Sequence, residues 1–275
     1  MDINTITEVV SRPSHASLAS FGDGDAWLGG GTWLFSEPQP GIRRLIDLDG
    51  FNWTPIEQDA HGLVISATCK IAELKAWTRP ASWSGGVLID QCCDALLGSF
   101  KIWNMASVGG NLCLALPAGP MTSLAAGLGG TCTIWTPEGS AHTVPAAQFV
   151  TGVRKTVLMR GELLRSIHLP ALALSGRTAF RQVSLTPRGR SGVLLIGTLA
   201  PSGETAITVT ASTVRPIRLV FGALPRHDDL RDAIEAAIAP GDYHDDIHGH
   251  PAWRRHLTIT LAEAIRLELA GEAAL

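Results

Sequence analysis

The sequence predicts an α+β protein, and three observations lead to that prediction. The chain has 275 residues, of which 45% are hydrophobic and 17% charged, enough for about two packed units. Up to about residue 168, short apolar runs of strand type are mixed with segments of helical spacing. From about residue 170 onward, β-rich runs follow one another with short turns between them, which is typical of an antiparallel meander.

Residues 1–50 form the first predicted unit, with the order helix, strand, Gly-rich loop, strand. The apolar run Ala26–Leu28 predicts one strand, which stops at the glycines of residues 29–31. The second strand is expected over residues 42–48, after a turn at Pro40-Gly41.

Residues 51–168 form the second predicted unit. Residues 63–67 predict a buried strand, and Thr68 is a candidate cap for a helix that runs through residues 71–77. Further along, we expect helices at residues 88–97 and 121–128 and strands at residues 132–135 and 163–169.

Residues 169–275 form the third predicted unit. Three β-rich runs, at residues 193–199, 206–214 and 217–223, predict a three-stranded antiparallel sheet. Two helices follow, one capped by Asp228 and one that begins near Pro251, which is a favourable residue for a first helical turn.

Composition excludes several classes of protein. A net charge of −3 offers no basic field for nucleic acid or an anionic membrane. The N-terminus lacks the pattern of a signal peptide, and the apolar run at residues 193–200 is far too short for a membrane span. The five cysteines form no CxxC pair, which favours buried free thiols. We therefore expect a cytoplasmic protein without nucleic-acid partners or a membrane span.

Two Gly-rich segments are the candidate ligand-binding elements, and each follows an apolar run. Glycines let the backbone turn sharply and bring amide N–H groups close to a ligand, and successive N–H groups bind anions. Either segment alone is more often a tight turn at the end of a strand, but the pair together predicts a site for a dinucleotide diphosphate. The segments are Gly29-Gly30-Gly31-Thr32 and Ser107-Val108-Gly109-Gly110-Asn111.

Other chemistry has weaker support. Residues 22–27 begin like a dinucleotide-binding fingerprint but end in Trp27 and precede a strand, and no P-loop or nucleophile elbow occurs. The stretch 244–250 holds histidines and aspartates, but we interpret it as a solvated connection between helices and predict no metal site. We interpret the basic clusters, including Arg188-Gly189-Arg190, as solvated faces or subunit contacts. No residue is predicted to be catalytic.

Several segments in order along the chain carry a resemblance to a known family. The residues Leu28-Gly29-Gly30-Gly31-Thr32-Trp33-Leu34 and Leu45-Ile46-Asp47-Leu48 are similar to an AGGTDLL…LIDL pattern, and residues 106–119 to ATIGGNL…SPAGD. Phe180-Arg181-Gln182, Val220-Phe221-Gly222-Ala223 and Trp253-Arg254-Arg255-His256-Leu257 match later motifs. The chain thus resembles the FAD-binding (medium) subunits of molybdenum hydroxylases, the xanthine dehydrogenase and carbon monoxide dehydrogenase family.

The resemblance implies a fold and a site. The fold would have two α/β FAD-binding subdomains of the vanillyl-alcohol-oxidase (PCMH-like) type, residues 1–50 and 51–168. A C-terminal domain of the CO-dehydrogenase-flavoprotein type would follow at residues 169–275. The cofactor would be FAD, with Leu164 beside the flavin ring and Arg181 approaching it. The full set of implied cofactor-binding residues is Gly29, Gly30, Gly31, Thr32, Trp33, Ser107, Gly109, Gly110, Asn111, Leu164 and Arg181.

This sequence departs from the family pattern at several positions near the expected site. Trp33 replaces a small or acidic residue, Pro120 replaces an Asp, and Leu114 and Leu116 replace hydroxyl-bearing residues. These changes remove polar contacts to the flavin half while both Gly-rich segments remain. We therefore expect FAD binding to be retained but weakened, or to depend on a partner. Some relatives carry an iron–sulfur insertion in this subunit, but the spacing between Ala115 and Cys132 leaves no room for it and the cysteines are scattered, so we expect no cluster in this chain.

The function that the resemblance implies is electron transfer. A large subunit with a molybdopterin cofactor would oxidise the substrate, a small subunit with [2Fe-2S] clusters would relay electrons, and FAD in this chain would pass them to an acceptor. The expected assembly is a dimer of such heterotrimers. Two alternatives stay open: a stand-alone FAD oxidoreductase, and a structural subunit whose FAD site has degenerated. The sequence does not identify the substrate or the acceptor.

Overall fold

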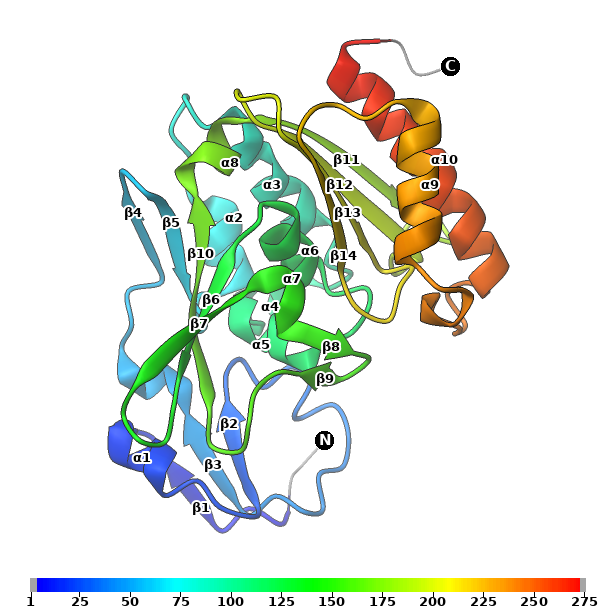
Figure 1. The fold of residues 1–275 in the computed structure, drawn as a ribbon. Coiled ribbons are helices and arrows are strands. Elements are labelled where there is room, and N and C mark those ends of the chain that lie inside the picture. The colour runs from blue at the N-terminus through cyan, green and yellow to red at the C-terminus, as the bar shows by residue number, and fades with distance from the viewer. Residues whose placement is uncertain (1–3, 273–275) are drawn as a thin grey trace.

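The computed structural model describes residues 4–272 and contains three main sheets (Figure 1). The first is a small parallel sheet with the order β1-β3-β2, at the lower end of the view. The short strand β1 was not predicted, since only three of its residues pair and two of them are exposed. The elements of this first part of the chain are β1 (Glu8–Val10), α1 (His15–Ala19), β2 (Asp25–Leu28), β3 (Arg44–Asp47) and the 3-10 turn η1 (Leu48–Phe51).

The second sheet is antiparallel, and its five strands have the order β4-β5-β10-β6-β7. β10 lies at its centre because it is the longest strand and carries buried residues on both faces. A two-stranded hairpin, β8 with β9, lies along the chain between β7 and β10. The strands are β4 (Ile56–Asp59), β5 (Gly62–Ser66), β6 (Thr131–Trp135), β7 (Ala141–Pro145), β8 (Val150–Gly152), β9 (Lys155–Thr156) and β10 (Leu163–Pro170).

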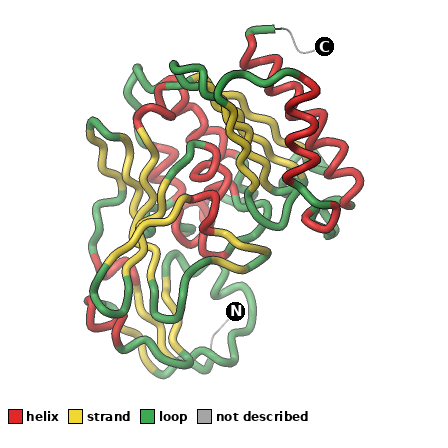
Figure 2. Tube along the Cα trace, viewed as in Figure 1, coloured by secondary structure: helices red, strands yellow, loops and turns green. Residues whose placement is uncertain are grey.

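Helices fill the space between the second sheet and the third, as the red tubes of Figure 2 show. Their buried side chains, with those of β5, β6 and β10, form the main hydrophobic core. Burial raises the pKa of the Cys69 and Cys132 thiols to about 12, so both stay protonated within this core. The helices are α2 (Ile71–Ala76), η2 (Ser84–Gly86), α3 (Val87–Asp94), α4 (Phe100–Met105), α5 (Val108–Leu114), α6 (Pro120–Gly127), α7 (Ala146–Phe149) and α8 (Ala171–Ser175).

The third sheet has four antiparallel strands, not the three that the sequence predicted. The extra strand, β11 (Arg177–Val183), lies at the edge; its residues are mostly half-buried, so it lacks the apolar pattern of its neighbours. One face of the sheet packs on α6 and the other on α9 and α10. The remaining elements are β12 (Val193–Leu199), β13 (Thr205–Thr210), β14 (Ile217–Phe221), α9 (His227–Ala237), η3 (Pro240–Asp242) and α10 (Pro251–Ala270).

Two of the predicted helix caps differ from the observed ones. Thr68 does not cap α2, because its hydroxyl lies 3.1 Å from the Ser66 hydroxyl; Lys70 occupies the N-cap position. Likewise, α9 begins after Arg226, and Asp228 lies in its first turn, where a negative charge suits the helix dipole. Both helices start within a few residues of the predicted positions.

Candidate functional site

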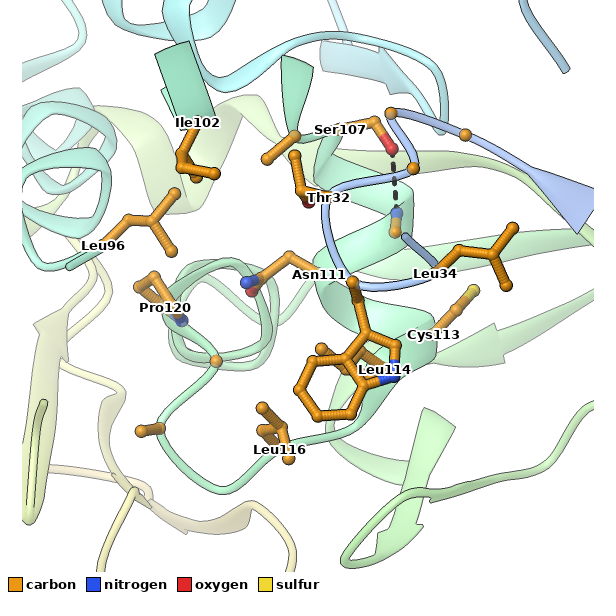
Figure 3. Close-up of a pocket in the computed structure, with 18 of the residues that line it drawn as sticks. Thr32, Leu34, Leu96, Ile102, Ser107, Asn111, Cys113, Leu114, Leu116 and Pro120 are labelled. Atoms are coloured by element: carbon orange, nitrogen blue, oxygen red, sulfur yellow. Dashed lines mark hydrogen bonds between the residues drawn. The ribbon is translucent and has the colours of Figure 1, made fainter. Parts of the chain in front are cut away.

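A cavity of about 450 Å³ lies where the first sheet meets the helical layer (Figure 3). Three segments form most of it: the loop after β2, the chain from the end of α3 through α4, and the helices α5 and α6 with the turn that joins them. Both Gly-rich segments predicted from the sequence therefore contribute to a single cavity.

Close backbone contacts explain two glycines of the first loop. A Cβ added at Gly30 would lie 1.6 Å from the Met105 carbonyl oxygen, so only glycine lets the loop approach the end of α4. Gly31 has a φ of +68°, a left-handed conformation that L side chains rarely adopt. These glycines place the loop against the protein and thereby hold its next residues at the cavity.

The loop after β2 presents a run of amide donors. The backbone N–H groups from Gly30 to Leu34 have no hydrogen-bond acceptor among residues 4–272, and the Thr32 hydroxyl has none either. All of these residues line the cavity. Consecutive free N–H groups of this kind make an anion-binding concavity. Anion binding by this loop stays a prediction, for which these unpaired donors are available.

The second Gly-rich segment is the start of a helix, which corrects its interpretation as a loop. Ser107 is the N-cap of α5, and its Oγ accepts from the Gly110 N–H at 3.1 Å. The N–H groups of Val108 and Gly109 donate to the Cys69 and Ala67 carbonyl oxygens, at 2.8 and 3.0 Å. All three donors are therefore used within the protein: that of Gly110 by the helix cap, and those of Val108 and Gly109 by the chain that follows β5.

Close packing also explains Gly109. A Cβ at this position would lie 2.5 Å from the Cβ of Ala67, so glycine is required for α5 to sit against the end of β5. Gly109 does not line the cavity, whereas Ser107, Gly110 and Asn111 do. The segment predicted from the sequence does line the cavity, but Gly109 is required by its contact with Ala67 and not by a contact with a ligand.

Asn111 links α5 to α6 and faces the cavity. Its side-chain Oδ1 accepts from the Met121 N–H at 3.0 Å, which assigns the oxygen of the amide. The Nδ2 group has no acceptor among the described residues, so both of its hydrogens are available to a ligand. In Figure 3, the Asn111 side chain lies between Thr32 and Pro120.

The rest of the lining is mostly apolar, and it includes positions that depart from the family pattern. Leu96, Ile102 and Pro120 lie on one side of the view in Figure 3, and Leu114 and Leu116 lie below Asn111. None of these side chains carries a hydrogen-bonding group. A ligand would therefore find donors at one part of the cavity and apolar contacts at the other.

Trp33, the other departure, also lines the cavity. The Arg154 guanidinium lies over its ring, 4.9 Å from the centroid. Arg154 follows β8 in a left-handed conformation, and its N–H donates to the Ala115 carbonyl oxygen at 2.9 Å. A cation at this distance is attracted to the ring, so this pair joins the loop after β2 to the β8–β9 hairpin.

Arg190 is the one charged residue among those that line the cavity. Its cluster was predicted to form a solvated face or a subunit contact, because nothing in the local sequence pattern marks Arg190. It comes from the connection between β11 and β12, far along the chain from the two Gly-rich segments. Arg190 also borders a small adjoining cavity of about 50 Å³, with His244, Asp246 and Arg254.

Leu164 and Arg181 are not brought to this cavity. Leu164 is 1% exposed in the middle of the second sheet, where it pairs with Ile134 and belongs to the main core. The Arg181 guanidinium forms an ion pair with Glu268 of α10 at 2.6 Å. β11 and α10 therefore hold Arg181 outside the lining of the cavity.

The stretch 244–250 is organised around Arg254. This side chain is 1% exposed, and it donates to the carbonyl oxygens of Gly249, Gly192 and Ala211 and to the Asp246 carboxylate. His244 Nε2 lies 3.3 Å from the same carboxylate. Within residues 4–272, no group of three or more His, Cys, Asp or Glu side chains is arranged to hold a metal ion.

A comparison with protein families finds one match. The family described as the FAD binding domain in molybdopterin dehydrogenase matches residues 13–172, which include both Gly-rich segments. A xanthine dehydrogenase from Oryza sativa subsp. japonica is 32% identical over 115 residues, which cover 40% of this chain and 8% of that protein. The chain thus spans less than a tenth of this relative.

Solved structures share the whole fold at low identity. One is a reconstituted CO dehydrogenase from Oligotropha carboxidovorans, with a TM-score of 0.83, 22% identity and coverage of 99% of this chain and 100% of that chain. Another is quinoline 2-oxidoreductase from Pseudomonas putida 86, with a TM-score of 0.78, 20% identity and coverage of 98% and 99%.

In the described part of the chain, no helix is long and apolar enough to cross a membrane.

Proposed function

Because the chain belongs to the family of FAD-binding domains in molybdopterin dehydrogenases, we propose that its 450 Å³ cavity holds FAD and that the chain is an electron-transfer subunit. The observation that carries this proposal is the run of free N–H groups from Gly30 to Leu34. A diphosphate has the charge and the multiple acceptor oxygens that such a run requires. The Thr32 hydroxyl and the Asn111 amide add side-chain donors beside it.

The donors are numerous enough for tight binding. Each hydrogen bond to a charged group contributes roughly 1.5–3 kcal/mol net. Three or four such bonds from the loop after β2 are therefore sufficient, without the N–H groups of α5. The diphosphate would rest mainly on one loop, and α5 would contribute through Asn111 and the position of its first turn.

The apolar part of the cavity suits a planar ring better than a chain of hydroxyl groups. Leu114, Leu116 and Pro120 offer contact area but no hydrogen bonds to the polar linker of the cofactor. We therefore expect FAD to bind this chain more weakly than a site with polar residues at these positions. A partner subunit that covers the cavity would compensate for the missing contacts.

The wider assembly is part of the proposal. FAD accepts and donates electrons, while the protein binds it, orients it and tunes its potential. We propose that the chain works with a large molybdopterin-binding subunit and a small [2Fe-2S] subunit, as a dimer of heterotrimers in the cytoplasm. The family description, an FAD binding domain in molybdopterin dehydrogenase, supports a molybdopterin-binding partner. We also propose the domain bounds 1–50, 51–168 and 169–275; β1 to β3 lie in the first range and β11 to β14 in the third, while β10 extends across the boundary at residue 168.

The flavin content of the purified chain tests this proposal. The visible spectrum, together with chromatography of the cofactor released on denaturation, should show about one FAD per chain, or full loading after incubation with excess FAD. The variant Pro120→Asp, which restores an acceptor at the start of α6, should raise the loading if it is incomplete. No binding by either protein, alone or in complex with its partners, would exclude the proposed cofactor.

The apolar lining favours one alternative, a structural subunit with a degenerate FAD site. That subunit would bind partners normally but carry no flavin in the complex. The other alternative, a stand-alone FAD oxidoreductase, requires that the purified chain be reduced directly by a substrate. Flavin in the complex without direct reduction of the isolated chain would exclude both.

A further inference from the structure

A second cavity, of about 280 Å³, lies at the other end of α6. It shares no lining residue with the cavity described above. Most of its lining is apolar, and the charged side chains are those of Arg218 and Glu204. The apolar members are Leu128, Pro170, Leu172, Ala173, Leu199 and Ala200.

Arg218 lies on the inner face of the third sheet. It is directly opposite Thr208 of β13, which is opposite Ile196 of β12, so the three side chains share one face. Ile196 packs against Gly127 at the end of α6 and belongs to the main core. The Arg218 side chain therefore starts between the sheet and the helical layer, on the face away from α9 and α10.

The guanidinium of Arg218 lacks a protein partner. Its Nε is buried and has no hydrogen-bond acceptor, and no carboxylate lies within 4.0 Å of it among the described residues. Burial lowers the pKa of Arg218, and the charge of Glu204 opposes this effect. A guanidinium remains charged under all ordinary conditions, so a partly desolvated cation with unused donors faces the cavity.

The end of α6 does not supply the hydrogen-bond acceptor that Arg218 lacks among the described residues. The Arg218 Nη2 lies 3.2 Å from the position that a Cβ on Gly129 would occupy, just beyond the C-terminus of α6. The helix dipole favours a cation at this point. It supplies no acceptor for the buried Nε, however, so this donor stays unpaired among the described residues.

We propose that this cavity binds a small organic acid, with its carboxylate on the guanidinium of Arg218 and its apolar body against Leu128 and Leu199. A carboxylate matches the fork of a guanidinium through two parallel hydrogen bonds. The proposal does not depend on FAD binding, because the cavity belongs to different elements. Glu204, exposed at the same cavity, repels such a ligand and sets its affinity.

Fluorine NMR of 4-fluorobenzoate with the full-length chain tests the proposal. We expect saturable line broadening, and much weaker broadening with the neutral analogue 4-fluorobenzamide. Arg218→Gln should weaken benzoate binding at least about tenfold, because a charge-assisted pair is lost. Arg215→Gln removes an exposed arginine of the loop before β14 and serves as the matched control, with no expected change.

Glu204→Gln provides an independent test that does not alter the buried residue. Removing this negative charge should strengthen benzoate binding about twofold to tenfold and leave benzamide unchanged. Equal binding of acid and amide, or equal binding by Arg218→Gln, would overturn the proposal. Absence of saturable benzoate binding to Glu204→Gln up to about 10 mM would also overturn it.

Discussion

The Asn111 Oδ1 accepts a hydrogen bond from the Met121 N–H at 3.0 Å and thereby connects α5 to the first turn of α6. The first residues of α6 need this contact, since its N-cap is Gly119, which has no side chain, and Pro120 has no N–H. The same contact fixes the orientation of the Asn111 amide. Helix capping and the direction of a ligand donor are therefore set by one interaction.

Two variants distinguish the roles of Asn111 as an acceptor for the Met121 N–H and as a donor to a ligand. Asn111→Asp keeps an acceptor for Met121 but replaces the donor with a negative charge, so FAD affinity should fall at least about tenfold with little loss of stability. Asn111→Leu removes both, and should also lower the free energy of unfolding by about 1–2 kcal/mol. Fluorescence titration with FAD and urea unfolding measure the two effects. Unchanged affinity in Asn111→Asp would contradict the assigned donor role.

Gly30→Ala tests the contact between the loop after β2 and α4. The added Cβ would meet the Met105 carbonyl oxygen at 1.6 Å, so the loop must move and its N–H groups lose their alignment. We expect at least a tenfold loss of FAD affinity, together with a destabilisation of about 1–3 kcal/mol. Gly41→Ala, where nothing lies within 4 Å of the new Cβ, is the control and should bind FAD normally.

Arg190→Gln tests the charged residue in the lining of the FAD cavity. Loss of this cation should weaken FAD binding by about threefold to tenfold, and the loss should shrink at high salt because the side chain is exposed. Arg188→Gln, an exposed arginine of the same connection that does not line the cavity, is the matched control. If the two variants bind FAD equally, Arg190 makes no contribution to the site.

Arg254→Gln should destabilise the C-terminal part of the chain by about 3–5 kcal/mol. The substitution leaves three buried carbonyl oxygens and the Asp246 carboxylate without their donor. Arg255→Gln removes a half-exposed ion pair with Glu235, and should change the free energy of unfolding by less than about 1 kcal/mol. Urea unfolding of both variants measures the contrast, and similar values would argue against a buried network around Arg254.

The Asp25–Arg44 pair predicts a pH dependence of stability. The hydrogen bonds from the Arg44 guanidinium lower the pKa of Asp25 below 3.8, and the N–H of Gly22 adds to this. The carboxylate therefore stabilises the fold above the unfolded pKa, and this stabilisation is lost as the pH falls through the folded value. Asp25→Asn should cost about 1–3 kcal/mol at pH 7 in urea unfolding, and this cost should be smaller at a pH below 3.8. A cost that is the same at both pH values would exclude this linkage.

Much of the fold was predictable because its signals are local. Glycines and prolines interrupt the chain at the ends of elements, and α6 and α10 begin at the prolines that favour a first helical turn. β12 and β13 were predicted from continuous apolar or β-branched runs, since both faces are buried. β11 was missed as a strand because an edge position leaves its side chains half exposed.

The candidate site was predictable only in part. Gly30 and Ser107 were identified because they lie in Gly-rich segments whose backbone can approach a ligand closely, but the role of Ser107 as the N-cap of α5 was not predicted. Arg190 was not, because its place at the cavity depends on how the connection after β11 crosses to the helical layer. The position of Arg181 was not predictable either. This residue belongs to a family motif, but the packing of α10 on the third sheet pairs it with Glu268.

By itself, the sequence determined that this chain is an α+β protein with two Gly-rich segments and the pattern of a flavin-binding family. These properties follow from residue types and their spacing, which act over a few residues. Only the tertiary structure decided which N–H groups remain free for an anion. Those of Val108 and Gly109 are used by residues 67–69, whereas those from Gly30 to Leu34 are not, and hydrogen bonds between distant segments are formed only when the chain folds.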